Sequence, residues 1–177
     1  MNTQKQHNEP ATFEKVWQMF QETDKKFQET DKKLNKLENL FTGQWGKLIE
    51  SLIEGDLINI LAQRGIRVFN TYTRATYSFN NEKGEIDIIA ANGNEVVVVE
   101  VKTTLHPNDI TEFMDVLKIF KKAFPLYKSE KVYGAVAYLK AESKANIRAE
   151  RMGLFVIRAT GNSATIANDE NFKPKEF

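Results

Sequence analysis

The sequence predicts a mixed α/β domain in which helices flank a central mixed sheet, with a long heptad-repeat helix in front of it. Three observations support this prediction. Apolar residues recur at helical spacing in several segments, β-branched residues form short runs between them, and a seven-residue repeat occupies the first quarter of the chain. We therefore expect a heptad-repeat helix at residues 1–42 and an α/β domain at residues 43–177.

The heptad segment contains the sequence QETDKKF at 21–27, followed at once by QETDKKL at 28–34. Apolar residues repeat every seven positions, and a second set follows three positions later, as at the a and d positions of a coiled coil. The a set is Phe13, Phe20, Phe27, Leu34 and Phe41, and the d set is Val16, Thr23, Thr30 and Leu37. One helix cannot bury so narrow a stripe by itself.

Two partners for this stripe are open. One is the same segment, residues 12–41, of another copy, which would give a parallel homodimer or a higher oligomer. The other is the body of the same chain. We favour self-association because the repeat is regular and charged outside the stripe, and we expect the segment to end at Thr42-Gly43.

The body is expected to have the element order α-β-β-β-α-β-α-β. The predicted segments are a helix at 45–63 ended by Gly65, strands at 66–76, 85–91 and 95–104, a helix from Asp109 to Pro125, a strand at 131–140, a helix at 141–152, a strand at 154–159 and an irregular tail. Asn80-Asn81 and Lys83-Gly84 bracket a predicted turn, and Asn-Gly at 92–93 predicts a hairpin. The valine run at 96–99 indicates burial on both faces.

Composition restricts the class of protein. The chain has no cysteine, which excludes a disulfide framework, a thiolate zinc site and a cysteine nucleophile. It has no apolar run long enough to span a membrane, and its first ten residues do not resemble a signal peptide, so we expect a cytoplasmic protein without a membrane partner. The net charge of +1 gives no support for nucleic-acid binding. Five lysines between 118 and 131 form either a solvated face or a phosphate-contacting patch.

Charged residues end an otherwise apolar strand. Because side chains alternate along a strand, Glu100 and Lys102 share one face with Val96 and Val98. The hairpin brings Asp87 opposite this region, so that the carboxylates of Asp87 and Glu100 converge. Two carboxylates suit magnesium, whose bound water can attack phosphorus, and Lys102 would orient that water or stabilise the charged oxygens. The alternative is an ordinary surface ion pair between Glu100 and Lys102.

The segment GEIDIIAANGNEVVVVEVKTT at 84–104 resembles the motif of the PD-(D/E)XK, or restriction-endonuclease-like, superfamily. It is similar to archaeal Holliday-junction resolvases and their small bacterial relatives, some of which carry a coiled-coil arm. The resemblance covers about residues 44–160. It implies an αβββαβ core and magnesium-dependent phosphodiester hydrolysis, with manganese able to substitute.

The motif carries over onto this sequence residue by residue. Its aspartate, second acid and lysine are Asp87, Glu100 and Lys102. Ile86 stands where many members have proline. For the glutamate that members often carry on the first helix, Glu54, eleven residues before Gly65, matches best, and Glu50 is its rival.

The sequence therefore favours a metal-dependent endonuclease that hydrolyses DNA and assembles as an oligomer through its heptad segment. Two alternatives stay open. One is a catalytically silent binding or assembly module with the same fold, and the other is a coiled-coil adaptor that recruits another protein.

Overall fold

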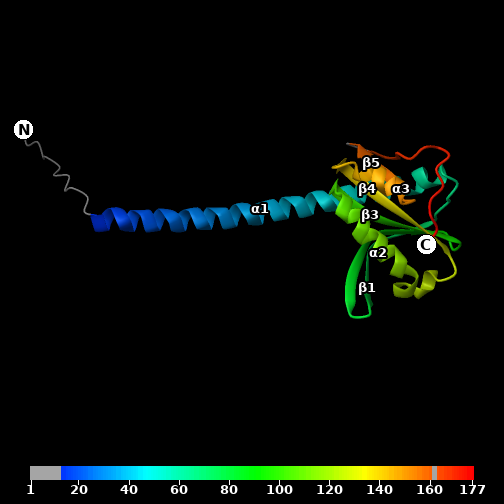
Figure 1. The fold of residues 1–177 in the computed structure, drawn as a ribbon, viewed down its shortest axis with the longest axis horizontal. Coiled ribbons are helices and arrows are strands. Elements are labelled where there is room, and N and C mark those ends of the chain that lie inside the picture. The colour runs from blue at the N-terminus through cyan, green and yellow to red at the C-terminus, as the bar shows by residue number, and fades with distance from the viewer. Residues whose placement is uncertain (1–12, 161–162) are drawn as a thin grey trace, which may run out of the picture. The chain divides into compact units, whose positions relative to one another are not determined.

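The computed structural model describes residues 13–160 and 163–177. The chain divides into two compact units, Met1–Gly43 and Gln44–Phe177. Helix α1 (Phe13–Ala62) contains the heptad segment and continues into the second unit (Figure 1). It runs through Thr42 and Gly43, where the sequence predicted an end, because one glycine costs a helix only about 1 kcal/mol. We expect no signal peptide in the first ten residues, and these residues lie outside the described part of the chain.

Six strands form one mixed sheet in the second unit, and their spatial order is their chain order. The strands are β1 (Asn70–Phe79), β2 (Glu82–Ala91), β3 (Glu95–Leu105), β4 (Lys131–Ala141), β5 (Phe155–Thr160) and β6 (Ser163–Ile166). The first three strands pair antiparallel, β3, β4 and β5 pair parallel, and β6 returns antiparallel. The predicted class, mixed α/β with a mixed sheet, is confirmed.

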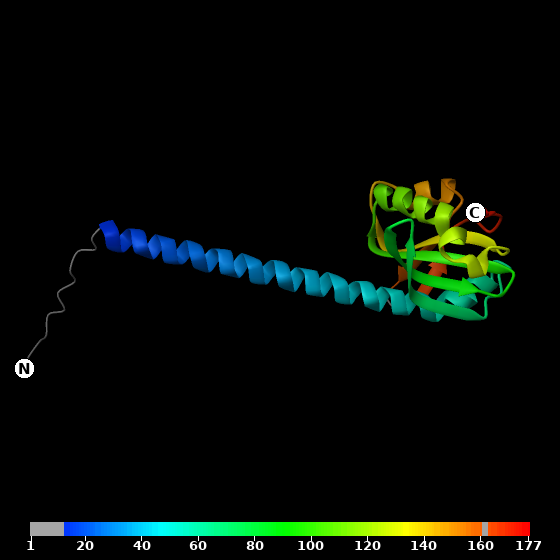
Figure 2. The ribbon, with the colours of Figure 1, turned by 90° about the horizontal axis from the view of Figure 1, so that it is seen from below.

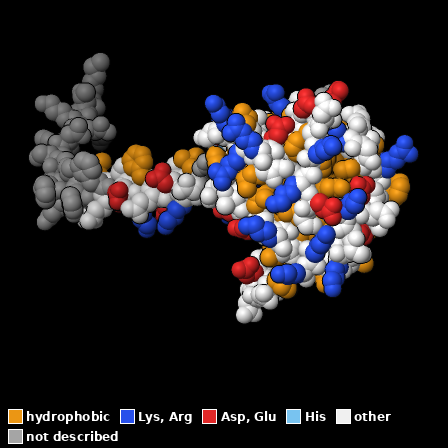
Figure 3. All heavy atoms as spheres, turned by 45° about the vertical axis from the view of Figure 1, so that its right-hand side comes forward, with side chains coloured by type: hydrophobic (Ala, Val, Ile, Leu, Met, Phe, Trp, Pro, Cys, Tyr) orange, Lys and Arg blue, Asp and Glu red, His pale blue; other side chains and the backbone are white. Residues whose placement is uncertain are grey.

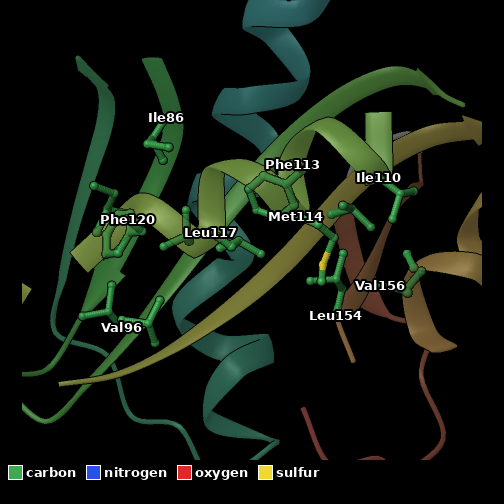
Figure 4. Packing of buried hydrophobic residues seen from close by; sticks show 14 of the residues in the cluster. Ile86, Val96, Ile110, Phe113, Met114, Leu117, Phe120, Leu154 and Val156 are labelled. Carbon is green, nitrogen blue, oxygen red and sulfur yellow. The ribbon is translucent and has the colours of Figure 1, made fainter. Parts of the chain in front are cut away.

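Helices cover both faces of this sheet (Figure 2). Helices α2 (Pro107–Ala123) and α3 (Ala145–Arg151) pack on one face, and the end of α1 packs on the other. On the α2 side, Phe113, Leu117 and Phe120 meet Val96 and other strand residues (Figure 4). The valine run is completely buried and divides its side chains between the two faces, as predicted. No helix in the described residues is long and apolar enough to cross a membrane.

Gly65 ends α1 as the sequence predicted. It has a φ of 82°, a conformation that residues with a Cβ adopt at a cost. The Gly65 N–H donates to the Ala62 carbonyl at 3.0 Å, and the Ile66 N–H donates to the Leu61 carbonyl at 3.1 Å. These two bonds satisfy carbonyls that the helix end would otherwise leave unpaired.

Two strand boundaries were predicted wrongly. Strand β1 begins at Asn70, not at 66, because Ile66 and Val68 are buried in the α1-side core without a ladder partner. The hairpin turn contains only Asn80-Asn81, with φ of 50° and 66°, as suits a two-residue turn. Gly84 lies within β2 opposite Tyr77, whose ring covers the place of a Cβ.

Three other boundaries also differ from the sequence prediction. Helix α2 begins at Pro107, a residue favoured in the first turn, and the backbone N–H of His106 donates to Asp109 Oδ2 at 2.6 Å. The helix therefore begins two residues before the predicted start at Asp109. Helix α3 is shorter than predicted because β4 extends to Ala141 and a left-handed turn follows. Strand β6 and an isolated bridge between Tyr133 and Glu176 lie in the tail that was predicted irregular.

Candidate functional site

The candidate site lies where β2 separates from β3. Paired residues between these strands end at Ile88 and Val99, and beyond that point the Asp87 side chain replaces the ladder. Asp87 Oδ2 accepts a hydrogen bond of 2.7 Å from the backbone N–H of Val101. The carboxylate is therefore held in the gap between two strands, a position that alternation along β2 does not predict. We call this place the strand fork.

Arg74 lies on the other side of Asp87. The β1–β2 register pairs Thr73 with Ile88 and Ala75 with Ile86, which leaves Arg74 opposite Asp87 but outside the ladder. Its φ is 55°, a left-handed conformation that is uncommon for a residue with a long side chain. Strained backbone of this kind persists only where its surroundings determine it, and it is found disproportionately at functional sites.

The face alternation of β2 also breaks at the strand fork. Ile88 belongs to the α1-side core, whereas Ile89 and Ile86 both belong to the α2-side core. Ile86 and Ile88 would share a face in a regular strand. The break in alternation therefore falls between Ile86 and Ile88, at Asp87, whose carboxylate accepts the hydrogen bond from Val101 on β3.

Glu100 and Lys102 complete the cluster from β3. Val99 and Val101 contact the α1-side core, so the residues between and after them face the α2 side. Lys102 Nζ lies 2.6 Å from Glu100 Oε1, and the two side chains are 37% and 20% exposed. This short ion pair is consistent with the prediction that the two charges lie side by side on one face of the strand.

The surroundings of Asp87 oppose its ionisation. Burial, and then the negative charge of Glu100, raise the pKa of the Asp87 carboxyl from 3.8 to about 6. The Val101 N–H and Lys102 act in the other direction, and Glu50 adds to the rise. Asp87 and Glu100 are therefore near enough for each to affect the other, and a cation between them would relieve their repulsion.

Lys102 stays charged at neutral pH. Burial disfavours its charged form, but the hydrogen bond and the charge of Glu100, together with Asp87 and Asp109, outweigh burial and raise the pKa of Lys102 above 10.5. The side chain can therefore supply a fixed positive charge at this place, but it is poorly suited to accept a proton.

The two rival acids of α1 have different neighbours. Glu54 Oε1 accepts a hydrogen bond of 3.1 Å from the Thr71 hydroxyl on β1. Glu50 Oε2 accepts two hydrogen bonds from the Arg74 guanidinium, at 2.9 and 3.1 Å. Of the two acids, only Glu50 contributes to the raised pKa of Asp87. The acid that the motif matched less well is thus the one that acts on the strand fork.

The carboxylate oxygens at the strand fork are the type of ligand that a hard cation binds. Magnesium takes oxygen ligands, keeps several waters and typically uses one or two carboxylates, which Asp87 and Glu100 can supply. Over residues 13–160 and 163–177, no group of three or more His, Asp or Glu side chains converges closely enough to hold a metal ion. The predicted ligand set of Asp87, Glu100 and Glu54 therefore remains a prediction.

Two features of the site had no readable signal in the sequence. The left-handed Arg74 and the Val101 N–H bond depend on how β2 leaves the sheet, which no residue type encodes. His106 lies at the start of α2 with Nδ1 3.6 Å from Glu142 Oε2. It belongs to the turn that joins β3 to α2.

Together these observations define a mixed α/β domain with a carboxylate–lysine site at an internal split of its sheet. The family model described as "Domain of unknown function (DUF8196)" matches residues 59–166. The chain belongs to this family. The match includes β1, β2 and β3 and leaves out the heptad segment and both rival acids of α1, Glu50 and Glu54.

Two solved structures resemble part of the chain. A repair endonuclease from Pyrococcus abyssi is 18% identical with a TM-score of 0.42, and the match covers 60% of this chain and 45% of that one. The EndoMS-dsDNA2 complex is 13% identical with a TM-score of 0.40, covering 62% and 44%. This chain thus spans less than half of either structure, and likeness at this level does not establish its activity. No curated protein matches the sequence.

Proposed function

We propose that this chain is a metal-dependent nuclease that hydrolyses phosphodiester bonds of DNA. The observation that carries the proposal is the strand fork, where Asp87 and Glu100 are neighbours and Lys102 bonds to Glu100. Neutral side chains would fill such a place at lower cost in free energy, whereas a bound cation would stabilise both carboxylates. The resemblance to the PD-(D/E)XK motif selects the same three residues.

The roles of the residues follow from their charges. Asp87 and Glu100 would hold magnesium, or manganese in its place, and such a metal supplies an activated water and neutralises phosphate charge. The Val101 N–H fixes the Asp87 carboxylate before a ligand arrives. Lys102 would stabilise the negative oxygens that develop on phosphorus, because its raised pKa keeps it protonated.

We assign the helix acid of this site to Glu50 in preference to Glu54. Glu50 is 18% exposed in its side chain, it is held by Arg74, and its charge acts on Asp87. If it contributes to metal binding, Glu50→Gln should weaken manganese affinity, and Glu54→Gln should leave it unchanged. The opposite order would restore Glu54 as the helix acid.

DNA as the partner is supported by cations at the same edge of the sheet. Strands β3 and β4 are parallel and pair Thr104 with Lys140. The end of β3 that follows Lys102 therefore lies beside the end of β4 that leads to α3. Lys144, the N-cap residue of α3, is exposed, and so are Arg148 and Arg151 in the last turn of this helix. We call these three residues the α3 basic face. Lys and Arg side chains are also numerous on the surface drawn in Figure 3, as suits contact with a phosphate backbone.

A cleavage assay tests the proposal. The full chain would be incubated with plasmid, single-stranded and branched DNA in magnesium or manganese. We expect cleavage that needs the metal and that falls by roughly a hundredfold or more in Lys102→Ala. Lys173→Ala is the matched control, because this exposed lysine lies in the tail outside the candidate site. Cleavage that persists in Lys102→Ala would contradict the proposed role.

A silent binding module with the same fold is the second candidate. The specific observation that favours it is the 2.6 Å ion pair, which already occupies Glu100 Oε1 with Lys102. Calorimetric titration with manganese separates the two candidates. Binding that is lost in Asp87→Ala supports the nuclease, and no binding by the wild-type chain means that the charges at the strand fork are structural.

A further inference from the structure

The heptad part of α1 exposes an apolar stripe. Phe27, Leu34 and Leu37 are 65%, 56% and 62% exposed. With Phe27 and Leu34 at a positions, Leu37 falls at a d position, as do Thr23 and Thr30. Large apolar side chains in a regular row at this exposure need a partner surface, and a heptad row fits the equivalent row of another helix.

The two threonines of the stripe are prepared for burial. The Thr23 hydroxyl donates to the Met19 carbonyl at 2.7 Å, and the Thr30 hydroxyl donates to the Lys26 carbonyl at 2.8 Å. Each hydroxyl proton is therefore satisfied within its own helix. Both residues can enter an apolar interface without leaving a donor unpaired, which removes the main objection to threonine at a d position.

The charges that flank the stripe select the partner and its direction. The e positions are acidic, with Asp24, Asp31 and Glu38, and Lys26 and Lys33 stand at g positions. In a parallel pair, each g residue faces the e residue of the next heptad in the partner, so that Lys26 meets Asp31 and Lys33 meets Glu38. All four contacts of a symmetric dimer are then attractive.

We propose that the occupant of this stripe is a second copy of the same segment, aligned parallel and in register. An antiparallel pair would place g beside g and e beside e, so that lysines would face lysines and acids would face acids. None of the ion pairs among the described residues uses Lys26 or Lys33. These lysines are exposed and available to a partner helix.

Parallel pairing has a consequence for the rest of the chain. Each assembly would contain two copies of the second unit and therefore two strand forks. This pairing does not depend on nuclease activity. If the cleavage assay shows no activity, the proposed parallel pairing is unaffected. If the chain is monomeric, the proposed chemistry is unaffected.

Sedimentation of the full chain tests the pairing and the role of the charges. The wild type should have twice the chain mass of 20.3 kDa. Lys26→Glu/Lys33→Glu makes every g–e contact repulsive only if the helices are parallel, and it should weaken self-association about tenfold or more at low salt. Adding Asp31→Lys and Glu38→Lys to the same chain should restore it. A monomeric wild type, or no effect of the lysine replacements, would overturn the proposal.

Direction and register are tested by disulfide formation, since the chain has no cysteine of its own. Thr23→Cys and Thr30→Cys, made separately, should both give cross-linked dimers in high yield under mild oxidation. An antiparallel pair has one two-fold axis perpendicular to the helices, so it can bring only one of these positions together with its equivalent. Cross-linking at one position or at neither would overturn the proposal, and Lys32→Cys, on the outer side of the helix, is the control.

Discussion

Replacing Asp87 with asparagine should stabilise the metal-free protein at neutral pH and have little effect near pH 4. The folded state opposes ionisation of this carboxyl, because burial and Glu100 raise its pKa from 3.8 to about 6. Asparagine cannot ionise, and its amide oxygen can still accept the hydrogen bond from Val101. The substitution therefore removes a penalty and keeps a contact.

The magnitude follows from the two pKa values. A difference of about two pH units is equivalent to ~3 kcal/mol at 1.36 kcal/mol per unit. The carboxyl is only partly buried and is screened by solvent, so we expect about 1–2 kcal/mol. Because the folded pKa is the higher one, the folded protein binds more protons between these values, and wild-type stability falls as the pH rises from about 4 to 6. The stability advantage of Asp87→Asn over the wild type should therefore grow as the pH rises through the same range.

Urea denaturation at several pH values in the presence of a chelator measures this gap. Asp115→Asn is the matched control, because Asp115 is 68% exposed on α2 and pairs with Lys118. The reasoning is refuted if Asp87→Asn is less stable than the wild type at about pH 7.5, or if the gap does not depend on pH. Added magnesium should stabilise the wild type and leave the Asp87→Asn variant unchanged.

Three further predictions concern the core and the α3 basic face. Gly84→Ala should cost about 1–3 kcal/mol of stability in urea denaturation, because its Cβ would lie 2.5 Å from the Tyr77 ring; an unchanged midpoint would mean that the ring moves freely. Phe120→Ala should cost about 3–5 kcal/mol by the same measurement, since it empties a fully buried position. Arg148→Glu/Arg151→Glu should weaken DNA binding and flatten its salt dependence, measured by fluorescence anisotropy. Equal affinity at low salt would exclude the α3 basic face as the DNA surface.

The sequence predicted the sheet well where burial and period agree. The valine run, with four β-branched residues in a row, indicated a strand covered on both sides, and Gly65 indicated a helix cap. Gly84 misled the prediction because a glycine next to lysine is typical of a turn. Its real environment is a cross-strand tyrosine ring, which only the register reveals. Long-range contacts of this kind leave no local pattern.

The residues of the candidate site were chosen from the sequence motif and stay a prediction, whereas the geometry of the strand fork had no signal in the sequence. Strand alternation put Glu100 and Lys102 on one face, and the ion pair between them agrees with that prediction. The choice between Glu50 and Glu54 was made on their distance from Gly65 along the chain. The structure instead distinguishes them by their partners on β1, Arg74 and Thr71, because the fork turns Arg74 out of the ladder.

Several features that reduce stability lie together at the strand fork. Arg74 has a left-handed backbone, Asp87 has an ionisation that the fold opposes, and Glu100 and Lys102 are charges beside an apolar strand. The capped end of α1 at Gly65 is a contrasting case, in which local preference and packing agree. A sequence under selection for stability alone would replace these four residues with neutral ones at little cost. Ionisation of Asp87 lowers the stability of the folded protein, and a bound cation would offset this cost. The lower stability without metal and the proposed metal site are therefore two consequences of the same arrangement.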